Sequence, residues 1–170
     1  MSMTQSIATQ FLLVAVTCLA FSACGGGGVD PAPAAARTSM SPEQAEREVY
    51  QRVNQYRRSR GLPEQALDAR MSQLARDHSR RMASRGKLSH RGSDDRFSKL
   101  QGEPVQLISF AENVAFNLGH ANPAEKAVDG WIGSSGHRRN MTRREDQLTG
   151  IGAAVAGDGS WYFTQLFGER

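Results

Sequence analysis

Cysteine is almost absent from this chain. The 170 residues include two cysteines, Cys18 and Cys24, and both precede the part of the sequence that looks globular. No disulfide framework is therefore expected, and no cysteine is left in that part to act as a catalytic nucleophile. The sequence also lacks a nucleophile elbow around Ser or Thr and a phosphate-binding glycine loop. The common sequence motifs of covalent hydrolases and nucleotide-binding proteins are thus missing.

A strong excess of one charge is also missing. The chain has 21 basic and 17 acidic residues, a net charge of +4, which is weak evidence for an anionic partner. Short basic clusters occur at Arg57-Arg58-Ser59-Arg60, Arg80-Arg81, Arg138-Arg139 and Arg143-Arg144. They are typical of solvated helix faces, with contact to anionic lipid head groups or cell-wall polymers as the alternative. Nucleic acid is not an expected partner.

The N-terminal residues indicate export. Residues 11–23 form an apolar run that suits a signal peptide better than a spanning helix, which needs about 20 residues. The end of this run and the cysteine after it, Phe21-Ser22-Ala23-Cys24, resemble the lipobox of bacterial lipoproteins. This resemblance implies a signal peptide over residues 1–23, acylation of Cys24 and an extracytoplasmic protein anchored to the cell membrane or the outer membrane. A free thiol or an intermolecular bridge at Cys24 is the alternative.

One folded domain is expected after a linker. Residues 24–40 begin with the cysteine and are rich in Gly, Pro and Ala, a composition typical of a flexible tether. Residues 41–170 are long enough for one domain with its own core. The predicted organisation is therefore a signal peptide over 1–23, a lipidated linker over 24–40 and a domain over 41–170.

Three helices are predicted from caps and apolar spacing. A capping box at Ser41-Pro42-Glu43-Gln44 opens the first helix, which Gly61 ends. The second helix runs from Asp68 to Gly86 and places His78 on its apolar face, where a buried structural histidine is expected. A third helix begins at Asn122-Pro123-Ala124-Glu125 and buries Trp131.

Strands are predicted in the second half of the chain. They cover Leu107–Phe116, Leu148–Ala156 and Trp161–Phe167, and the last two are joined by the turn Gly157-Asp158-Gly159. Helices come first and an antiparallel pair comes last, so the fold class is predicted to be α+β, with the strands between helices.

Six segments, in order, resemble the bacterial branch of the CAP superfamily, which comprises cysteine-rich secretory proteins, antigen 5 and pathogenesis-related 1. The segments are Ala75–Ala83, Leu88-Ser89-His90, Ala111–Ala115, Trp131–Asn140, Gly150-Ile151-Gly152 and Phe163–Gly168. The resemblance covers about residues 45–168. It implies the family's three-layer α-β-α sandwich, with a C-terminal antiparallel hairpin and a central cleft.

The resemblance also implies candidate cleft residues. The best-known members line the cleft with two histidines and two glutamates, and His90 and Glu112 match one of each. Ser134 and Tyr162 stand where the second glutamate and the second histidine are expected, and His137 is the other histidine expected to face the cleft, as in bacterial relatives. Ser134 and Tyr162, together with Asn113, are therefore further cleft-lining candidates.

A zinc site is one interpretation of His90, Glu112 and His137. Two neutral imidazoles and one carboxylate could hold Zn²⁺ with an open coordination position. The alternatives are a surface loop histidine at His90, a carboxylate that braces a loop at Glu112, and a histidine that caps a helix exit at His137.

A non-catalytic binding module is the predicted function, with an envelope lipid, glycan or protein as ligand. The alternative is a metal-dependent, peptidase-like hydrolase of the cell envelope. Loss of one key donor or base costs about 10²–10³-fold in rate, and this chain has changed two positions of the family's set. A binding cleft tolerates such changes better, so no residue is predicted to be catalytic.

Overall fold

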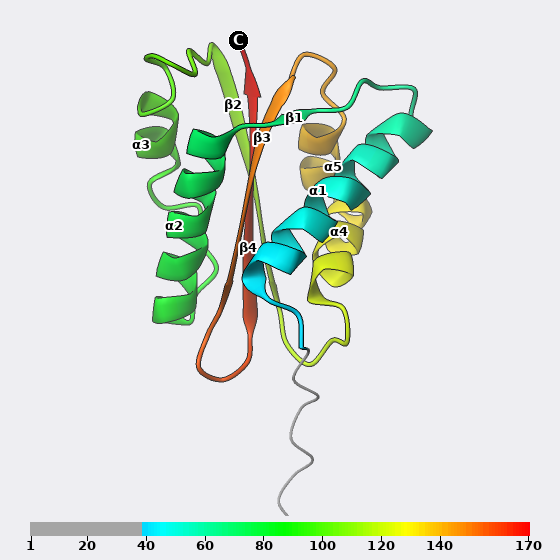
Figure 1. Cartoon of the computed structure of the whole chain (residues 1–170), viewed down its shortest axis with the longest axis vertical. Helices are drawn as coiled ribbons and strands as arrows, with labels where there is room; N and C mark the ends of the chain where they lie inside the picture. Colours follow the sequence, from blue (N-terminus) through cyan, green and yellow to red (C-terminus); the bar gives the residue numbers. More distant parts are fainter. Residues whose placement is uncertain (1–38) are drawn as a thin grey trace, which may run out of the picture. The chain divides into compact units, whose positions relative to one another are not determined.

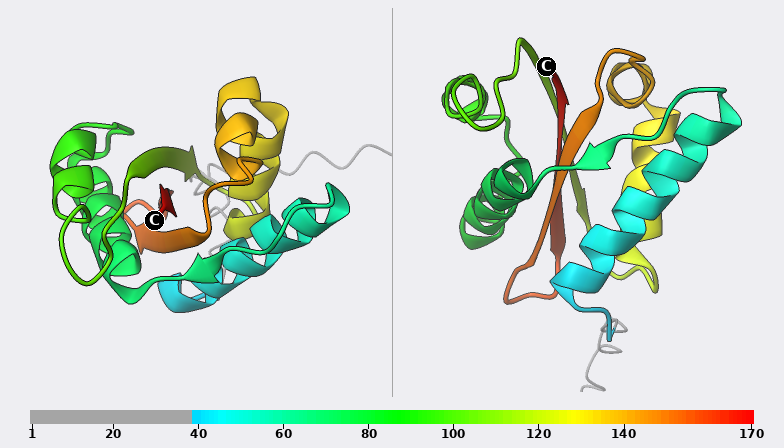
Figure 2. Two further views of the ribbon diagram at one scale, coloured as in Figure 1. Left: turned by 90° about the horizontal axis from the view of Figure 1, so that it is seen from above. Right: turned by 45° about the horizontal axis from the view of Figure 1, so that its top comes forward.

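The computed structural model describes residues 39–170, which form a sheet between two layers of helices (Figures 1 and 2). The predicted α+β fold, an α-β-α sandwich with a C-terminal antiparallel hairpin, is confirmed. The signal peptide, Cys24 and the linker lie outside the described residues, except for the linker's last two positions. Within residues 39–170, none of the helices has the length and apolar character needed to cross a membrane.

The helices divide between the two faces of the sheet. One face is covered by α2 (Ala69–Arg85), beside which lies the short α3 (Ser93–Ser98). The other face is covered by α1 (Pro42–Ser59), α4 (Pro123–Gly133) and α5 (Ser135–Met141). The view from above in Figure 2 shows α2 and α3 on one side and α1, α4 and α5 on the other.

The sheet has four strands in the order β1-β3-β4-β2. They are β1 (Ala66–Leu67), β2 (Ser109–Asn117), β3 (Leu148–Val155) and β4 (Trp161–Glu169). The short β1 is parallel to β3, and the other pairs are antiparallel. β4 is therefore central, and β2 is an edge strand with one neighbour.

The predicted helix ends are confirmed where local chemistry specifies them. The Ser41 hydroxyl accepts a hydrogen bond from the backbone N–H of Gln44, and the Gln44 side chain accepts one from the Ser41 N–H, which completes the capping box. Asp68 caps α2, and Gly86 ends that helix in the left-handed conformation. Asn122 accepts a hydrogen bond from the Glu125 N–H at the start of α4. These groups satisfy backbone donors and acceptors that a helix end leaves unpaired.

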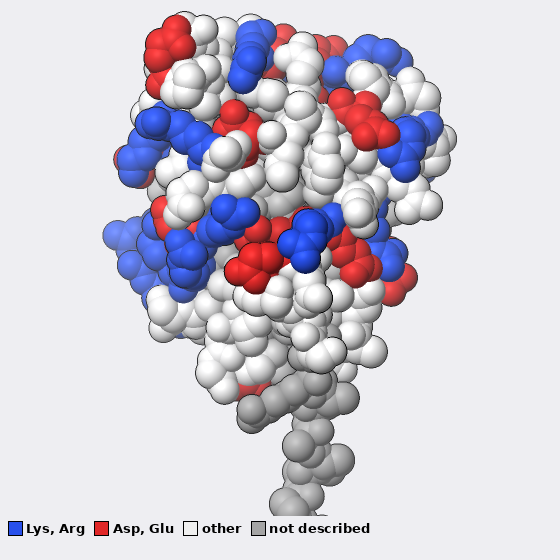
Figure 3. All heavy atoms as spheres, in the orientation of Figure 1, with Lys and Arg blue, Asp and Glu red and all other residues white. Residues whose placement is uncertain are grey.

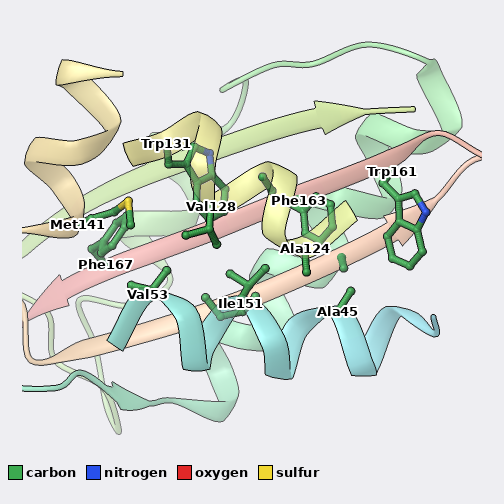
Figure 4. Close-up of a cluster of buried hydrophobic side chains, with 13 residues drawn as sticks. Ala45, Val53, Ala124, Val128, Trp131, Met141, Ile151, Trp161, Phe163 and Phe167 are labelled. Atoms are coloured by element: carbon green, nitrogen blue, oxygen red, sulfur yellow. The ribbon is translucent and has the colours of Figure 1, made fainter. Parts of the chain in front are cut away.

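Alternation along β4 builds a different core on each face. Trp161, Phe163 and Phe167 point toward α1 and α4, where they join a cluster of thirteen buried apolar residues that includes Trp131 (Figure 4). Tyr162 and Leu166 point the other way and belong to two smaller clusters under α2. The period of two in a strand explains this division. Both tryptophans lie in the core, as predicted.

Two glycines allow α2 to lie directly on β3. A Cβ atom at Gly150 would come within 2.3 Å of the Met71 carbonyl carbon, and one at Gly152 within 2.2 Å of the Ala75 carbonyl carbon. The obstructing atoms are backbone, so they cannot rotate away. The absence of side chains at the two glycines allows this close approach of helix and strand. As a result, α2 places His78 and the loop after it against the sheet.

Arg57 corrects the prediction of a solvated basic face at residues 57–60. Its side chain is fully buried, and it donates hydrogen bonds to the carbonyls of Pro63, Met141 and Arg143. Burial lowers the pKa of this guanidinium. Arg57 therefore ties the end of α1 to the loop between α5 and β3 instead of facing water.

Candidate functional site

Glu112 lies at the centre of the candidate site because of its place on β2. Alternation along this strand turns Phe110, Glu112 and Val114 toward α2 and α3, where Phe110 and Val114 pack in the smaller clusters. Asn113 points toward α5 on the opposite face. Glu112 is thus an acidic residue on the otherwise apolar inner side of an edge strand, and its side chain is only 2 % exposed.

Both carboxylate oxygens of Glu112 are occupied by other side chains of the protein. His90 donates from Nδ1 to Oε1 at 2.9 Å, and Arg96 donates from Nε to Oε2 at 2.7 Å. Arg96 is almost completely buried and also donates to the Arg91 carbonyl, whereas the His90 side chain is 55 % exposed. Glu112 therefore joins β2 to α3 and to the loop after α2.

Arg96 is a residue of this site that the sequence did not reveal. It lies in α3, a helix of six residues that has no side-chain cap and that the apolar spacing did not predict. A buried glutamate on a strand requires a cationic or hydrogen-bonding partner, but the sequence offers 21 basic residues without indicating which one. Only the fold brings Arg96 to Glu112.

His78 is buried, as predicted, and lies beside this group. Its Nε2 donates to the Ser89 carbonyl at 2.7 Å and lies 3.9 Å from Glu112 Oε1. Burial, assisted by the positive charge of Arg96, lowers the pKa of His78 to about 4, so the ring is neutral at pH 7. Its Nδ1 atom is buried and has no hydrogen-bond partner among the described residues.

His137 belongs to α5, a helix that packs against the face of β2 to which Asn113 points. The sequence placed it at a helix exit, but a second short helix begins at Ser135 and contains it. Asn113 donates to the His137 carbonyl at 3.1 Å, and Asn140 donates to Asn113 Oδ1 at 2.9 Å, so these bonds hold α5 against the strand. The pKa of His137 is lowered by burial and, to a smaller extent, by the charge of His90. The two histidines are therefore close enough to interact electrostatically.

The remaining candidates differ in their exposure. Asn113 is fully buried and fastens α5 to β2. Tyr162 is 2 % exposed, with its ring 5.2 Å from that of Phe116 between the ring centroids, so it is part of the core under α2. Ser134, between α4 and α5, is partly exposed. We name His90, His137 and Ser134, which are all accessible to solvent near β2, the histidine edge.

The arrangement of these side chains does not fit a resident metal ion. Within residues 39–170, no group of three or more His, Cys, Asp or Glu side chains is placed to hold one. Both oxygens of Glu112 are bonded to His90 and Arg96, and a metal cation at either oxygen would meet the charge of Arg96. No step through zinc is therefore derived from this site.

The comparisons with known proteins agree with the fold and the sequence motifs. The model of the cysteine-rich secretory protein family (CAP) matches residues 50–167. The uncharacterised protein YkwD of Bacillus subtilis (strain 168) is 27% identical over 126 residues, which are 73% of this chain and 47% of that protein. The chain thus spans about half the length of this curated relative.

Solved structures show the same architecture at low sequence identity. An outer surface protein from Borrelia burgdorferi has a TM-score of 0.67 at 16% identity, over 77% of this chain and 96% of that chain. The crystal structure of NaASP2 with Zn²⁺ has a TM-score of 0.54 at 16% identity, over 78% of this chain and 82% of that chain. At such identities the likeness concerns the fold.

Proposed function

The chain belongs to the cysteine-rich secretory protein (CAP) family, and from this premise we propose that it is a non-catalytic binding module of the cell envelope. The histidine edge would present His90, His137 and Ser134 to an envelope ligand, a lipid, glycan or protein. In this proposal Glu112, Arg96 and Asn113 fix the shape of the edge and do not react. Cys24 would anchor the domain through its acyl chains, with the linker as tether.

The burial of Glu112 and the hydrogen bonds that its carboxylate accepts are the observations that support this proposal. A hydrolase needs a group that activates water and can reach the substrate. The Glu112 side chain is 2 % exposed, and its oxygens accept hydrogen bonds from His90 and Arg96. A carboxylate in this position can orient His90 and anchor α3, and its burial leaves little of its surface open to a ligand. Ligand contact then falls to the exposed histidine edge.

An extracytoplasmic location is supported by two independent features. The sequence before the domain resembles a lipoprotein signal, and the Borrelia burgdorferi protein that shares the fold is described as an outer surface protein. The domain's lack of cysteine is compatible with export, because its core needs no disulfide. Fractionation of cells that express Cys24→Ser tests the anchor, because the anchored protein leaves the membrane fraction when the acylated residue is removed. Retention of Cys24→Ser in that fraction, without acyl labelling of the unsubstituted protein, would contradict it.

A second candidate, a metal-dependent hydrolase, rests on one contact. The bond from His90 to Glu112 resembles the way a carboxylate orients a catalytic imidazole in hydrolases. However, the positive charge of Arg96 already balances that carboxylate, and the residues do not form a metal site. The NaASP2 structure contains Zn²⁺, so zinc belongs in the experiment that separates the two candidates.

An assay of substrate hydrolysis distinguishes the binding module from the hydrolase. The purified protein is incubated with casein, a lipid ester and peptidoglycan, with and without Zn²⁺, beside His137→Ala as a variant that leaves the Glu112 bonds intact. We expect no turnover above buffer in any arm. Turnover by the unsubstituted protein that His137→Ala abolishes, at an unchanged melting temperature, would make the protein an enzyme.

A further inference from the structure

A pocket of about 170 Å³ lies beside the last turns of α2, and its lining does not include His90, Glu112 or His137. Arg81 and Arg85 line it from α2, and Lys87 and Arg91 line it from the segment that follows. The left-handed turn at Gly86 reverses the chain, so that the Lys87 N–H bonds back to the Met82 carbonyl. Four cationic side chains thus surround one small pocket.

In the described part of the chain, the side chains of these four residues lack the direct ion pairs that other basic residues form, although the charge of Arg81 helps to lower the pKa of Asp95. Arg52, Arg58 and Arg76 each form an ion pair with a glutamate. In contrast, across residues 39–170 no ion pair or hydrogen bond is formed by the side chains of the four cations of the pocket, which are Arg81, Arg85, Lys87 and Arg91.

Two acidic groups near the pocket have closer basic partners than the four cations that line it. Asp77 pairs with Arg80, and Asp95 pairs with Lys99. Figure 3 shows one group of basic side chains on the side of the molecule that α2 covers in Figure 1, and further basic side chains elsewhere on this face. Arg81 and Arg85 lie four residues apart on α2, where like charges repel each other. Together with Lys87 and Arg91 they give the pocket a positive potential.

One more residue of the lining has a ring nitrogen that is able to accept a hydrogen bond. His78 lines it, and the buried Nδ1 of this neutral ring has no partner among the described residues, because its Nε2–H donates to Ser89. A ligand that suits the pocket carries negatively charged oxygens for the guanidinium groups and a hydroxyl for the imidazole. The volume is smaller than the roughly 300–1,000 Å³ of sites for drug-sized ligands, so a small anionic group fits.

We propose that this basic pocket binds a phosphate group that has a hydroxyl of its own or is attached to a hydroxyl-bearing substituent. Arg81 and Arg85 would bind the phosphate oxygens from α2, and Lys87 and Arg91 would close the opposite side. Guanidinium groups match phosphate oxygens in geometry as well as in charge. This site is separate from the histidine edge, and neither depends on the other.

Two sources can supply this chemistry, the head group of an anionic lipid and free inorganic phosphate. The position in the fold favours the lipid. The last turn of α2 and the first turn of α1 lie at the same end of the domain, so the described chain begins at the end that carries the pocket (Figure 1). An anchor that precedes residue 39 would be attached at this end of the domain, and each basic residue near a membrane adds to the attraction for anionic lipid.

The test uses the full chain carrying Cys24→Ser, so that no acyl chain contributes. Inorganic phosphate is titrated at constant ionic strength, and the imidazole signals of His78 are followed by NMR. Vesicles of phosphatidylglycerol and phosphatidylcholine are compared with vesicles of phosphatidylcholine alone. The ratio of the two partition coefficients removes any contribution that does not depend on lipid charge.

The variants separate the pocket from net charge. Arg81→Gln/Arg85→Gln removes two charges from the pocket, and the matched control Arg70→Gln/Lys126→Gln removes two exposed charges, from the far end of α2 and from α4. We expect a saturable shift of the His78 signals with phosphate, or a partition ratio about 30-fold higher for the control than for the pocket variant. Melting temperatures check that both variants fold.

Each outcome has a consequence for the proposal. Saturable phosphate binding without a lipid preference identifies free phosphate as the source, and the reverse identifies the head group. Equal loss in the pocket variant and the control would show that net charge alone is responsible, which overturns the site. Absence of both phosphate binding and a charge-dependent partition would overturn it as well.

Discussion

The two faces of the sheet are stabilised in different ways. Under α1 and α4 lies a cluster of thirteen buried apolar residues, in which Trp131 of α4 meets Trp161 and two phenylalanines of β4. The buried Asn54 and Arg57 of α1 donate hydrogen bonds to backbone carbonyls. Under α2 and α3 the apolar clusters are smaller, and buried polar groups lie between them, including Ser79 bonded to Thr164 and Arg96 bonded to Glu112. The difference shows that one face supplies most of the apolar stabilisation, whereas the other fixes the positions of particular side chains.

The physical terms behind the two faces differ in kind. Apolar burial stabilises in proportion to the area removed from water and depends little on direction. A buried ion pair contributes little net stability, because desolvation offsets its attraction, but removal of one partner is costly. The polar face is therefore sensitive to single changes of charge, and the apolar face to changes of volume. The candidate site lies against the polar face.

The largest effect is expected on the apolar face. Trp131→Ala should lower the free energy of unfolding by about 3–5 kcal/mol through the cavity it leaves. The substitution also removes the hydrogen bond from Nε1 to the Val114 carbonyl, which is 3.0 Å long. Chemical denaturation of the variant measures the loss. A change below about 1 kcal/mol would mean that this face does not carry the stability assigned to it.

A slightly smaller effect is expected from charge removal on the polar face. Glu112→Gln should cost about 3–4 kcal/mol, because the buried Arg96 then keeps its charge without a counter-ion. Arg96→Met/Glu112→Gln should recover part of this loss, since it removes both charges. Denaturation of the single and double variants gives the comparison. A double variant that loses the sum of the two single losses would contradict the role of Glu112 as the partner of Arg96.

The next effect concerns pH. His78 has a pKa of about 4 in the folded protein, against 6.5 for the free side chain. Between pH 4 and pH 6.5 the unfolded chain therefore binds a proton at His78 and the folded chain does not. The contribution of neutral His78 to the free energy of unfolding is thus fully present above pH 6.5, and about 3 kcal/mol of it is lost as the pH falls to 4.

The control for this effect is His78→Gln, which can still donate to the Ser89 carbonyl but does not titrate. The pKa of Asp146 is raised by burial, which gives an opposite slope because its folded form favours the proton, and this slope is common to both proteins. The difference between the two curves thus isolates His78. Parallel curves for the variant and the unsubstituted protein would show that this histidine does not carry the dependence.

The sequence predicted the helices with local end signals and the C-terminal hairpin, because these depend on neighbours in the chain. The capping box at Ser41 and the glycine stop at Gly86 are such cases. Arg57 shows the limit of the same reasoning. It was predicted to face water with its basic neighbours, yet it follows Val49 and Val53 at the four-residue spacing of the buried face. That spacing could have revealed its burial.

The candidate site could be predicted only in part, because its partners come from distant segments. Motifs identified His90, Glu112 and His137, and the structure brings His90 onto Glu112. Strand alternation decides that His137 approaches β2 from the other face, and this depends on the register of β2 within the sheet. Arg96 gave no local indication.

The effect of Zn²⁺ on thermal unfolding at pH 7 shows whether Glu112 stays bonded to Arg96 and His90 when a metal ion is offered. Zinc bound by the folded state at 100 times its dissociation constant would stabilise it by about 2.7 kcal/mol. We expect Zn²⁺ to change the melting temperatures of the unsubstituted protein and of His90→Ala/His137→Ala by the same amount. Stabilisation of the unsubstituted protein that the double variant lacks would show that a metal competes for these side chains, and would contradict the account.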